Sequence, residues 1–457
     1  MKPANLRERA SLWPKSASIQ TRMKSRFLLA FPVLLFGCAA PAKAKVVPAK
    51  PKAAPAKPKA APRAASMPIS SGKAFDFQSA AKRAGEAGAL VASQNDFGAR
   101  LIIRLEQRNA RHENLLASPT SLWQALAMTS GGARGQTKAQ MSALLSMEHL
   151  PDTRIGAQNR AFNALLGEQK GASISVANSL WFADSFQANP AFVEQSKANF
   201  GAGVERFPGA KPEEGATRIN AWVSAHTQKE ITQIVQAGDI AGQISVLVNA
   251  VYFRGGWEDV FDKSQTKPAP FHLAGGKTVR LPTMNARRSH AYLSGTSFEG
   301  ARLPYKNTSC ALWVLLPKSG QTPADVLREL GQPKSQKLSA IGSVMLSLPR
   351  FEVQWRDNVA PDLAKMASLP FSNAANFSAM GQPTMGISLV LHVCKMRVDE
   401  EGTVAAAATV VAMAGSAAPK PEEPKVLKFD RPFVVALVEE TSGARLFEGT
   451  VYDPSAK

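Results

Sequence analysis

The sequence predicts an α+β fold, because helical patterns come first along the chain and long strands come later. Helix starts are marked by Asn95, by Ser118 followed by Pro119, and by Thr137 with Gln140. Six later runs have the length and apolar composition of strands. They cover residues 245–253, 311–316, 344–348, 387–398, 433–439 and 444–451.

The positive charge of the chain lies mainly in its N-terminal tail. The formal net charge is +20. Residues 1–84 hold 17 Lys and Arg against 2 Asp and Glu, whereas the remainder holds 38 against 33. A basic tail of this kind can bind anionic surfaces such as lipid headgroups. The nearly balanced body has no base-reading motif, so we expect no nucleic acid partner.

The first 84 residues have the layout of an exported precursor. Residues 1–22 form an extension, after which Lys24 and Arg26 precede an apolar run too short to span a bilayer. The run ends in Leu-Phe-Gly-Cys38, which resembles a bacterial lipobox and predicts lipidation of Cys38. Cleavage after Ala44 is the alternative. We assign residues 23–38 to the signal peptide and residues 39–84, rich in Pro, Ala and Lys, to an extended linker.

This layout predicts the location of the mature protein. A lipidated protein would be held at the outer membrane facing the periplasm, or at the cell surface. Cleavage after Ala44 would instead release a soluble, secreted protein.

The sequence contains no recognisable catalytic or metal-binding motif. Neither G-x-S-x-G nor H-E-x-x-H occurs, and the six histidines are not spaced as metal ligands. Three cysteines, Cys38, Cys310 and Cys394, build no disulfide framework. For the last two we expect buried thiols, with a bridge between them or a reactive thiol as alternatives. The protein is therefore expected to be no enzyme and to need no cofactor or metal.

Residues 399–413 (DEEGTVAAAATVVAM) form an unusual run of small and β-branched residues. In an extended strand, Thr403, Ala405, Ala407 and Thr409 would share one face. Such a segment can stay exposed as a loop or slide between two strands with little steric cost. Three prolines between residues 419 and 424 would block any further strand. An Ala-rich linker or an ordinary strand are the alternatives that the residues alone leave open.

This run resembles the hinge of the serpin family, whose usual form is EEGTEAAAAT. The matching positions are Glu400, Glu401, Gly402, Thr403, Val404, Ala405, Ala406, Ala407, Ala408 and Thr409. Other family blocks follow the same order along the chain. They lie at residues 114–121, 132–137, 249–257, 303–305, 315–317, 371–378, 429–433 and 447–451. Residues 85–457 are therefore identified as a serpin domain.

The resemblance implies the serpin fold, with mixed sheets, a large central sheet, surrounding helices and an exposed reactive loop. It also implies suicide inhibition of a serine, or cysteine, protease. The protease cleaves the loop and is trapped as a covalent acyl-enzyme while the loop inserts into the sheet. We expect a monomer whose partner is the target protease. A non-inhibitory serpin with a binding or chaperone-like role is the alternative, and an adhesin using the basic tail is a third.

The resemblance also assigns roles to residues outside the loop. Trp257 matches the tryptophan at the top of the sheet, where insertion begins. Four residues match the polar cluster beneath the sheet, where strands must part: Ser118, Ser121, Asn249 and His392. Val404 stands where the family has glutamate, at a position expected to face solvent after insertion.

Family spacing from the first hinge glutamate predicts the cleaved bond. Counting seventeen residues places Ser416 before the bond and Ala417 after it, in a window that includes Ala414 and Gly415. All four residues are small, and no Lys or Arg precedes Lys420 in the loop. We therefore expect a protease with a small uncharged pocket, of the elastase-like or subtilisin-like type.

Overall fold

The computed structural model describes residues 77–289, 291–332, 342–403 and 423–456. All of them belong to one unit, residues 60–457. The helices among them are α1 (Phe77–Gln107), α2 (Pro119–Ser130), α3 (Gly135–Leu144), α4 (Asp152–Gly167), α5 (Pro190–Phe200), α6 (Pro212–His226), α7 (Ala237–Ile240), α8 (Pro323–Leu330) and α9 (Ala360–Met366), with 3-10 turns η1 (Lys263–Gln265) and η3 (Leu369–Phe371). None of these described helices is long and apolar enough to cross a membrane.

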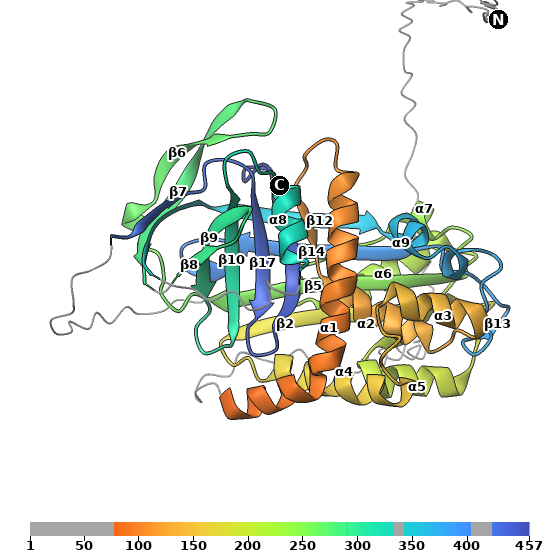
Figure 1. Cartoon of the computed structure of the whole chain (residues 1–457). Helices are drawn as coiled ribbons and strands as arrows, with labels where there is room; N and C mark the ends of the chain where they lie inside the picture. Colours follow the sequence, from red (N-terminus) through yellow and green to blue (C-terminus); the bar gives the residue numbers. More distant parts are fainter. Residues whose placement is uncertain (1–76, 290, 333–341, 404–422, 457) are drawn as a thin grey trace, which may run out of the picture. The chain divides into compact units, whose positions relative to one another are not determined.

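A large mixed sheet runs through the centre of the domain (Figure 1). Its strand order is β12 (Phe351–Asn358), β14 (Val390–Val398), β5 (Ser245–Gly256), β2 (Ala172–Ala183) and β4 (Gly203–Phe207). A two-residue strand, β15 (Gly402–Thr403), also pairs with β5. Within this sheet β14 runs parallel to β5, whereas β2 and β15 run antiparallel to it.

Two further sheets pack around the central one. The first has the order β1 (Leu115–Ala117), β18 (Ala444–Val451), β17 (Phe433–Glu439), β10 (Cys310–Pro317), β9 (Phe298–Pro304) and β8 (Tyr292–Ser294). The second has the order β16 (Lys425–Lys428), β11 (Val344–Pro349), β7 (Thr278–Arg288) and β6 (Lys267–His272). A short ladder joins β13 (Gly381–Gln382) to β3 (Gln187–Ala188).

Both faces of the central sheet are covered, which explains why its middle strands are apolar on both sides. On one face of β5, Val248 and Tyr252 pack in an apolar cluster with Ile219 of α6. On the other face, Leu247 and Val251 join the main core. Every residue of α2 is buried against this second face or its neighbours. A strand entering the sheet would therefore meet apolar contacts on both sides.

The six predicted strands are confirmed, and so is the helix that begins at Ser118 and Pro119. Their sequence patterns are strongly apolar, so the contacts with the core stabilise the same elements that the local residues favour. The observed β5 continues three residues past the predicted end, to Gly256, and β14 begins three residues later than predicted, at Val390.

The helix start predicted at Asn95 is wrong, because α1 begins at Phe77 and passes through Asn95 without a break. The Asn95 side chain instead donates to the Gly443 carbonyl at 2.9 Å and accepts the Arg445 amide at 3.1 Å. Residues 77–84, assigned to the linker, are thus part of this helix, and Ala80 is buried in the core.

The capping box predicted at Thr137 and Gln140 is also wrong. Helix α3 begins at Gly135 and has no side-chain cap. The Thr137 hydroxyl accepts from the Asn376 backbone amide at 2.8 Å, and the Gln140 side-chain oxygen Oε1 accepts from the Leu369 backbone amide at 3.0 Å. Both side chains satisfy a distant loop rather than their own helix end.

Candidate functional site

The pairing between β14 and β5 stops before β5 ends. It runs as far as Lys395 opposite Tyr252. Beyond that point β15 occupies the free edge of β5, with Thr403 opposite Gly255. Because β15 is antiparallel to β5, the top of the sheet already holds the start of a strand between β5 and β14. Parallel pairs are slightly less stable than antiparallel ones, so a strand inserted here would replace the weaker arrangement.

The turn from β14 into β15 is held by Trp257. Its indole nitrogen donates to the Asp399 carbonyl at 2.9 Å, and its backbone amide donates to the Glu401 carbonyl at 3.0 Å. Gly402 has a φ of 153°, and a Cβ there would lie 2.1 Å from the Gly255 carbonyl oxygen. The turn therefore requires glycine at this position.

The Thr403 side chain is fully buried and contacts an aromatic pair. Its hydroxyl lies 2.6 Å from the Tyr305 hydroxyl. The Tyr305 ring stacks on Trp257, with ring centroids 4.5 Å apart, and meets Phe253 edge-on at 4.7 Å. Burial raises the pKa of Tyr305 far more than the contact with Thr403 lowers it, so the phenol keeps its proton and can donate.

Glu400 anchors the other end of the turn: its buried carboxylate forms an ion pair with Arg350, whose side chain reaches the surface. The carboxylate accepts from Arg350 Nε at 2.7 Å and from the Thr266 hydroxyl. Burial alone would raise the pKa of Glu400, but the bonds from Arg350 and Thr266 outweigh it and hold the pKa below its ordinary value. Glu401 pairs with Lys263 nearer the surface. The Glu400 carboxyl is therefore ionised. Through Arg350 and Lys263, the two glutamates tie the turn to neighbouring elements.

A buried polar cluster lies lower down, beneath β5. The side-chain amide of Asn249 donates to Ser121 Oγ and to Asn178 Oδ1, and Ser121 itself donates to Asn178 at 3.2 Å. Asn249 Oδ1, however, has no hydrogen-bond partner among the described residues. An unsatisfied buried acceptor of this kind costs about 1–3 kcal/mol.

His392 closes the cluster on the β14 side, directly opposite Asn249. Its Nε2 accepts the Ser118 backbone amide at 3.0 Å and lies 3.1 Å from Cys394 Sγ. Burial lowers the pKa of His392 to about 3, more than the Asn249 backbone raises it. The ring is therefore neutral and its proton lies on Nδ1, which is in no aligned hydrogen bond with a described residue. One donor and one acceptor thus lack full partners where the two strands meet.

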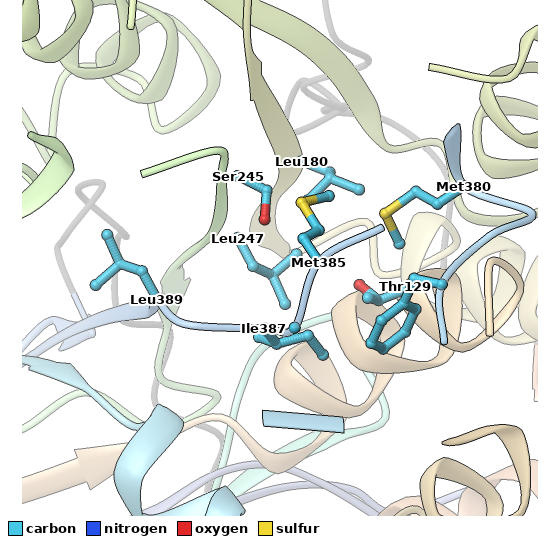
Figure 2. A pocket seen from close by; sticks show the side chains of 10 residues that line it. Thr129, Leu180, Ser245, Leu247, Met380, Met385, Ile387 and Leu389 are labelled. Carbon is cyan, nitrogen blue, oxygen red and sulfur yellow. The ribbon is translucent and has the colours of Figure 1, made fainter. Parts of the chain in front are cut away.

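A small apolar cavity lies at the far end of the same strands (Figure 2). Its volume is about 10 Å³, room for one water molecule. The residues labelled around it are Thr129, Leu180, Ser245, Leu247, Met380, Met385, Ile387 and Leu389. No titratable side chain lines it, so this cavity is a packing feature at the base of the sheet rather than a reaction site.

The described residues hold no cluster of His, Cys, Asp and Glu suited to a metal ion. Cys310 and Cys394 are free and buried, which confirms the predicted buried thiols. Burial raises both thiol pKa values far above the ordinary range. Neither cysteine therefore supplies a thiolate nucleophile in the folded chain.

Comparison with known proteins identifies the family to which this architecture belongs. The family model described as "Serpin (serine protease inhibitor)" matches residues 92–454. The chain belongs to the serpin family. The family match and the solved serpin structures confirm the serpin fold expected from the sequence. Members of the family are mostly protease inhibitors.

Relatives of this serpin come from distant organisms. It is 32% identical to the leukocyte elastase inhibitor of Bos taurus over 384 residues, which cover 80% of this chain and 99% of the relative. It is 30% identical to Serpin-Z10 of Arabidopsis thaliana over 391 residues, which cover 81% and 99%.

Solved serpin structures share the architecture. The thermophilic serpin tengpin in its native state matches with a TM-score of 0.72 at 27% identity, over 80% of this chain and 94% of that one. Human thyroxine-binding globulin matches with a TM-score of 0.71 at 23% identity, over 81% and 100%, which shows a common fold alone.

The structure brings the predicted site residues of this serpin together in two places. The turn at the top of the sheet holds Trp257, Glu400, Glu401, Gly402 and Thr403. The buried cluster holds Ser118, Ser121, Asn249 and His392. The rest of the predicted hinge (404–409), the bond window (414–417) and Cys38 lie outside the described residues.

Several residues of these two places had received no role from the sequence, among them Asn178, Thr266, Tyr305 and Arg350. Thr266 and Tyr305 lie in or near blocks that match the family, so their positions carried a signal. Arg350 stands between β11 and β12, and only the tertiary structure brings it to Glu400, which lies 50 residues later in the chain.

Proposed function

We propose that this serpin inhibits a serine, or cysteine, protease by a suicide mechanism. The protease nucleophile attacks the carbonyl carbon of Ser416, and the bond to the Ala417 nitrogen breaks as that nitrogen takes a proton. The acyl-enzyme would normally be hydrolysed. Insertion of the cleaved loop between β14 and β5 drags the protease away and distorts its catalytic groups, so the acyl bond persists.

The register of β15 on β5 is the observation that carries this proposal. Thr403 lies opposite Gly255, and β5 continues back to Ser245. A one-for-one continuation would set residues 404–413 against residues 254–245, so that Met413 would reach Ser245. The inserted strand would cover all of β5, about 40 Å at roughly 3.4 Å per residue. The acylated Ser416 would then lie just past the far end of the sheet.

The same register would bring the Thr409 hydroxyl to buried polar atoms that need a hydrogen-bond partner. Thr409 would lie opposite Asn249 and point to the same side as Thr403. Its hydroxyl could donate to Asn249 Oδ1 and accept from His392 Nδ1, the two atoms left without full partners. Because satisfying a buried acceptor recovers about 1–3 kcal/mol, the unpaired Asn249 Oδ1 favours the inserted state.

The small residues of the bond window indicate a protease with a small uncharged pocket, and leukocyte elastase inhibitors among the relatives support this choice. When the protein is mixed with elastase-like or subtilisin-like proteases, we expect an SDS-stable band at the summed mass. Mass spectrometry of the released peptide should show Ala417 at its start. A start outside residues 414–418 would refute the bond assignment.

The same experiment decides between inhibition and the alternative of a non-inhibitory serpin. If every protease tested cleaves the loop without forming a stable complex, the result supports the non-inhibitory serpin. A hinge of alanines after Thr403 favours inhibition, because none of these side chains would obstruct insertion.

We also propose that the protein is exported and anchored through a lipid on Cys38. The charged start, the short apolar run and Leu-Phe-Gly-Cys38 support this proposal. A single acyl chain binds membranes only weakly, so the lipobox type of anchor with several chains is needed for stable attachment. Cys38→Ser should therefore move the protein from the membrane to the soluble fraction. An unchanged partition into detergent would exclude the anchor.

A further inference from the structure

The four-stranded sheet that contains β16, the first strand after the loop in the sequence, carries positive charge and no negative charge on its strands. The strands β16, β11, β7 and β6 contain six Lys and Arg and no Asp or Glu. From residue 85 onwards the chain has 38 basic and 33 acidic residues, so the six positive charges of this sheet exceed the net excess of five in that whole region. The six are Lys267, Arg280, Arg287, Arg288, Lys425 and Lys428. The nearest acidic residue before β16 is the exposed Glu423.

One face of this sheet also exposes apolar side chains. Among the described residues, the exposed large hydrophobic side chains are Met345, 45% exposed, and Val426, 63% exposed. They are direct neighbours across the parallel pair β11–β16. Arg287 lies opposite Met345 on β7, and Lys428 follows Val426 by two residues, so all four point to one face. We call these four residues the sheet patch.

The basic members of the sheet patch, Arg287 and Lys428, are both exposed. Neither Arg287 nor Lys428 forms an ion pair with any carboxylate that the structure describes. Arg288, on the opposite face, is instead placed over the Phe261 ring at 4.3 Å. The exposed apolar pair and the exposed charges are therefore free to contact another protein, and Met and Arg are enriched at protein interfaces.

The position of the sheet patch identifies its partner. Lys425 lies nine positions after Ser416, so even a fully extended chain keeps the proposed cleaved bond within about 30 Å of β16. A protease of about 250 residues has a radius of gyration near 18 Å. An enzyme bound to the loop therefore extends far enough to contact the patch.

We infer that the sheet patch is a second contact site for the target protease. The patch would recognise an acidic surface with an apolar centre, which lies beside the substrate cleft of the protease. This inference rests on the proposed inhibitory function. The basic side chains would accelerate the encounter by electrostatic attraction, and Met345 with Val426 would bury apolar area in the first complex. A polyanion would use the charges but not the apolar pair, which is why the protease is favoured.

The test compares two proteases that share small-residue specificity, one acidic and one basic at the rim of the cleft. For wild type, we expect complex formation at least about tenfold faster with the acidic protease at low salt. The difference should shrink in about 0.5 M salt, where charges are screened beyond roughly 4 Å. The double variant Arg287→Glu/Lys428→Glu should lose the advantage. The matched control is Lys197→Glu/Arg218→Glu, on α5 and α6, and it should keep the advantage; Figure 1 shows α5 far from β6 and β7.

The apolar pair is tested separately. Met345→Ser/Val426→Ser should slow complex formation about threefold or more without changing the number of inhibitor molecules used per protease. Unchanged rates in both double variants would overturn the inference, while wild type still inhibits. Arg287→Glu/Lys428→Glu could weaken binding to dextran sulfate while the rates of complex formation with the protease stay constant. That result would assign the patch to polyanions and overturn the inference. A dimer abolished by the serine variants, again with constant rates, would do the same. Absence of any complex with wild type would overturn the proposed function as well.

Discussion

Thr403→Arg is expected to leave cleavage of the loop intact and to abolish the covalent complex. Thr403 is fully buried, with its hydroxyl 2.6 Å from that of Tyr305, and an arginine there would bury a charge without a partner. That costs several kcal/mol even after relaxation. Each increase of about 1.4 kcal/mol in the insertion barrier slows insertion tenfold, so hydrolysis of the acyl-enzyme should win by at least about hundredfold.

Gel electrophoresis and thermal melting check this prediction together. The variant should give cleaved protein where wild type gives an SDS-stable complex. Cleaved wild type should melt far above the intact protein because the sheet has gained a strand, and the cleaved variant should lose much of that gain. The intact variant should lose only the short β15 pairing, about 1–2 kcal/mol from its lost hydrogen bonds.

A charge at the adjacent position provides the matched control. Val404→Glu restores the residue usual in the family, and its side chain would point to the other face, opposite Arg254. This variant should inhibit as well as wild type. If Thr403→Arg also inhibits as well as wild type, loop insertion is not how this protein works.

Ser416→Arg is expected to exchange one class of target protease for another. A small uncharged pocket cannot accept an arginine, so complex formation with elastase-like proteases should fall at least about hundredfold, since an ionised group would be buried without a partner. Trypsin-like proteases carry an aspartate in that pocket and should now form the stable complex. Association rates and SDS-stable bands with both proteases measure the exchange.

Moving the arginine along the loop provides the control. Ala412→Arg should be cleaved by the trypsin-like protease without trapping it, because the arm that carries the acyl group would be four residues shorter. If Gly415→Arg traps the trypsin-like protease and Ser416→Arg does not, the cleaved bond follows residue 415 instead of residue 416. An elastase-like complex that Ser416→Arg leaves unaffected would exclude residue 416 from the pocket altogether.

The sequence by itself determined the elements in which local residue preference and tertiary packing favour the same structure. The strands at 433–439 and 444–451 were predicted at their observed bounds, since continuous apolar runs beside a Thr-Ser-Gly turn favour one structure locally. The hinge, Trp257 and the buried cluster were located through the motifs they share with serpins. Motif order along the chain was enough to identify the family, because each block packs in the same core.

Only the tertiary structure decided how polar side chains are used. Asn95, Thr137 and Gln140 looked like helix caps, yet each satisfies the backbone of a distant segment. Short polar side chains bond whichever backbone group is near, so local spacing cannot say whether that group is three or three hundred residues away. For the same reason the Arg350–Glu400 pair could not be read from the chain. The pairing of β15 with β5 beside the unfinished β14 pair was equally hidden, because strand register depends on which edges the fold leaves open.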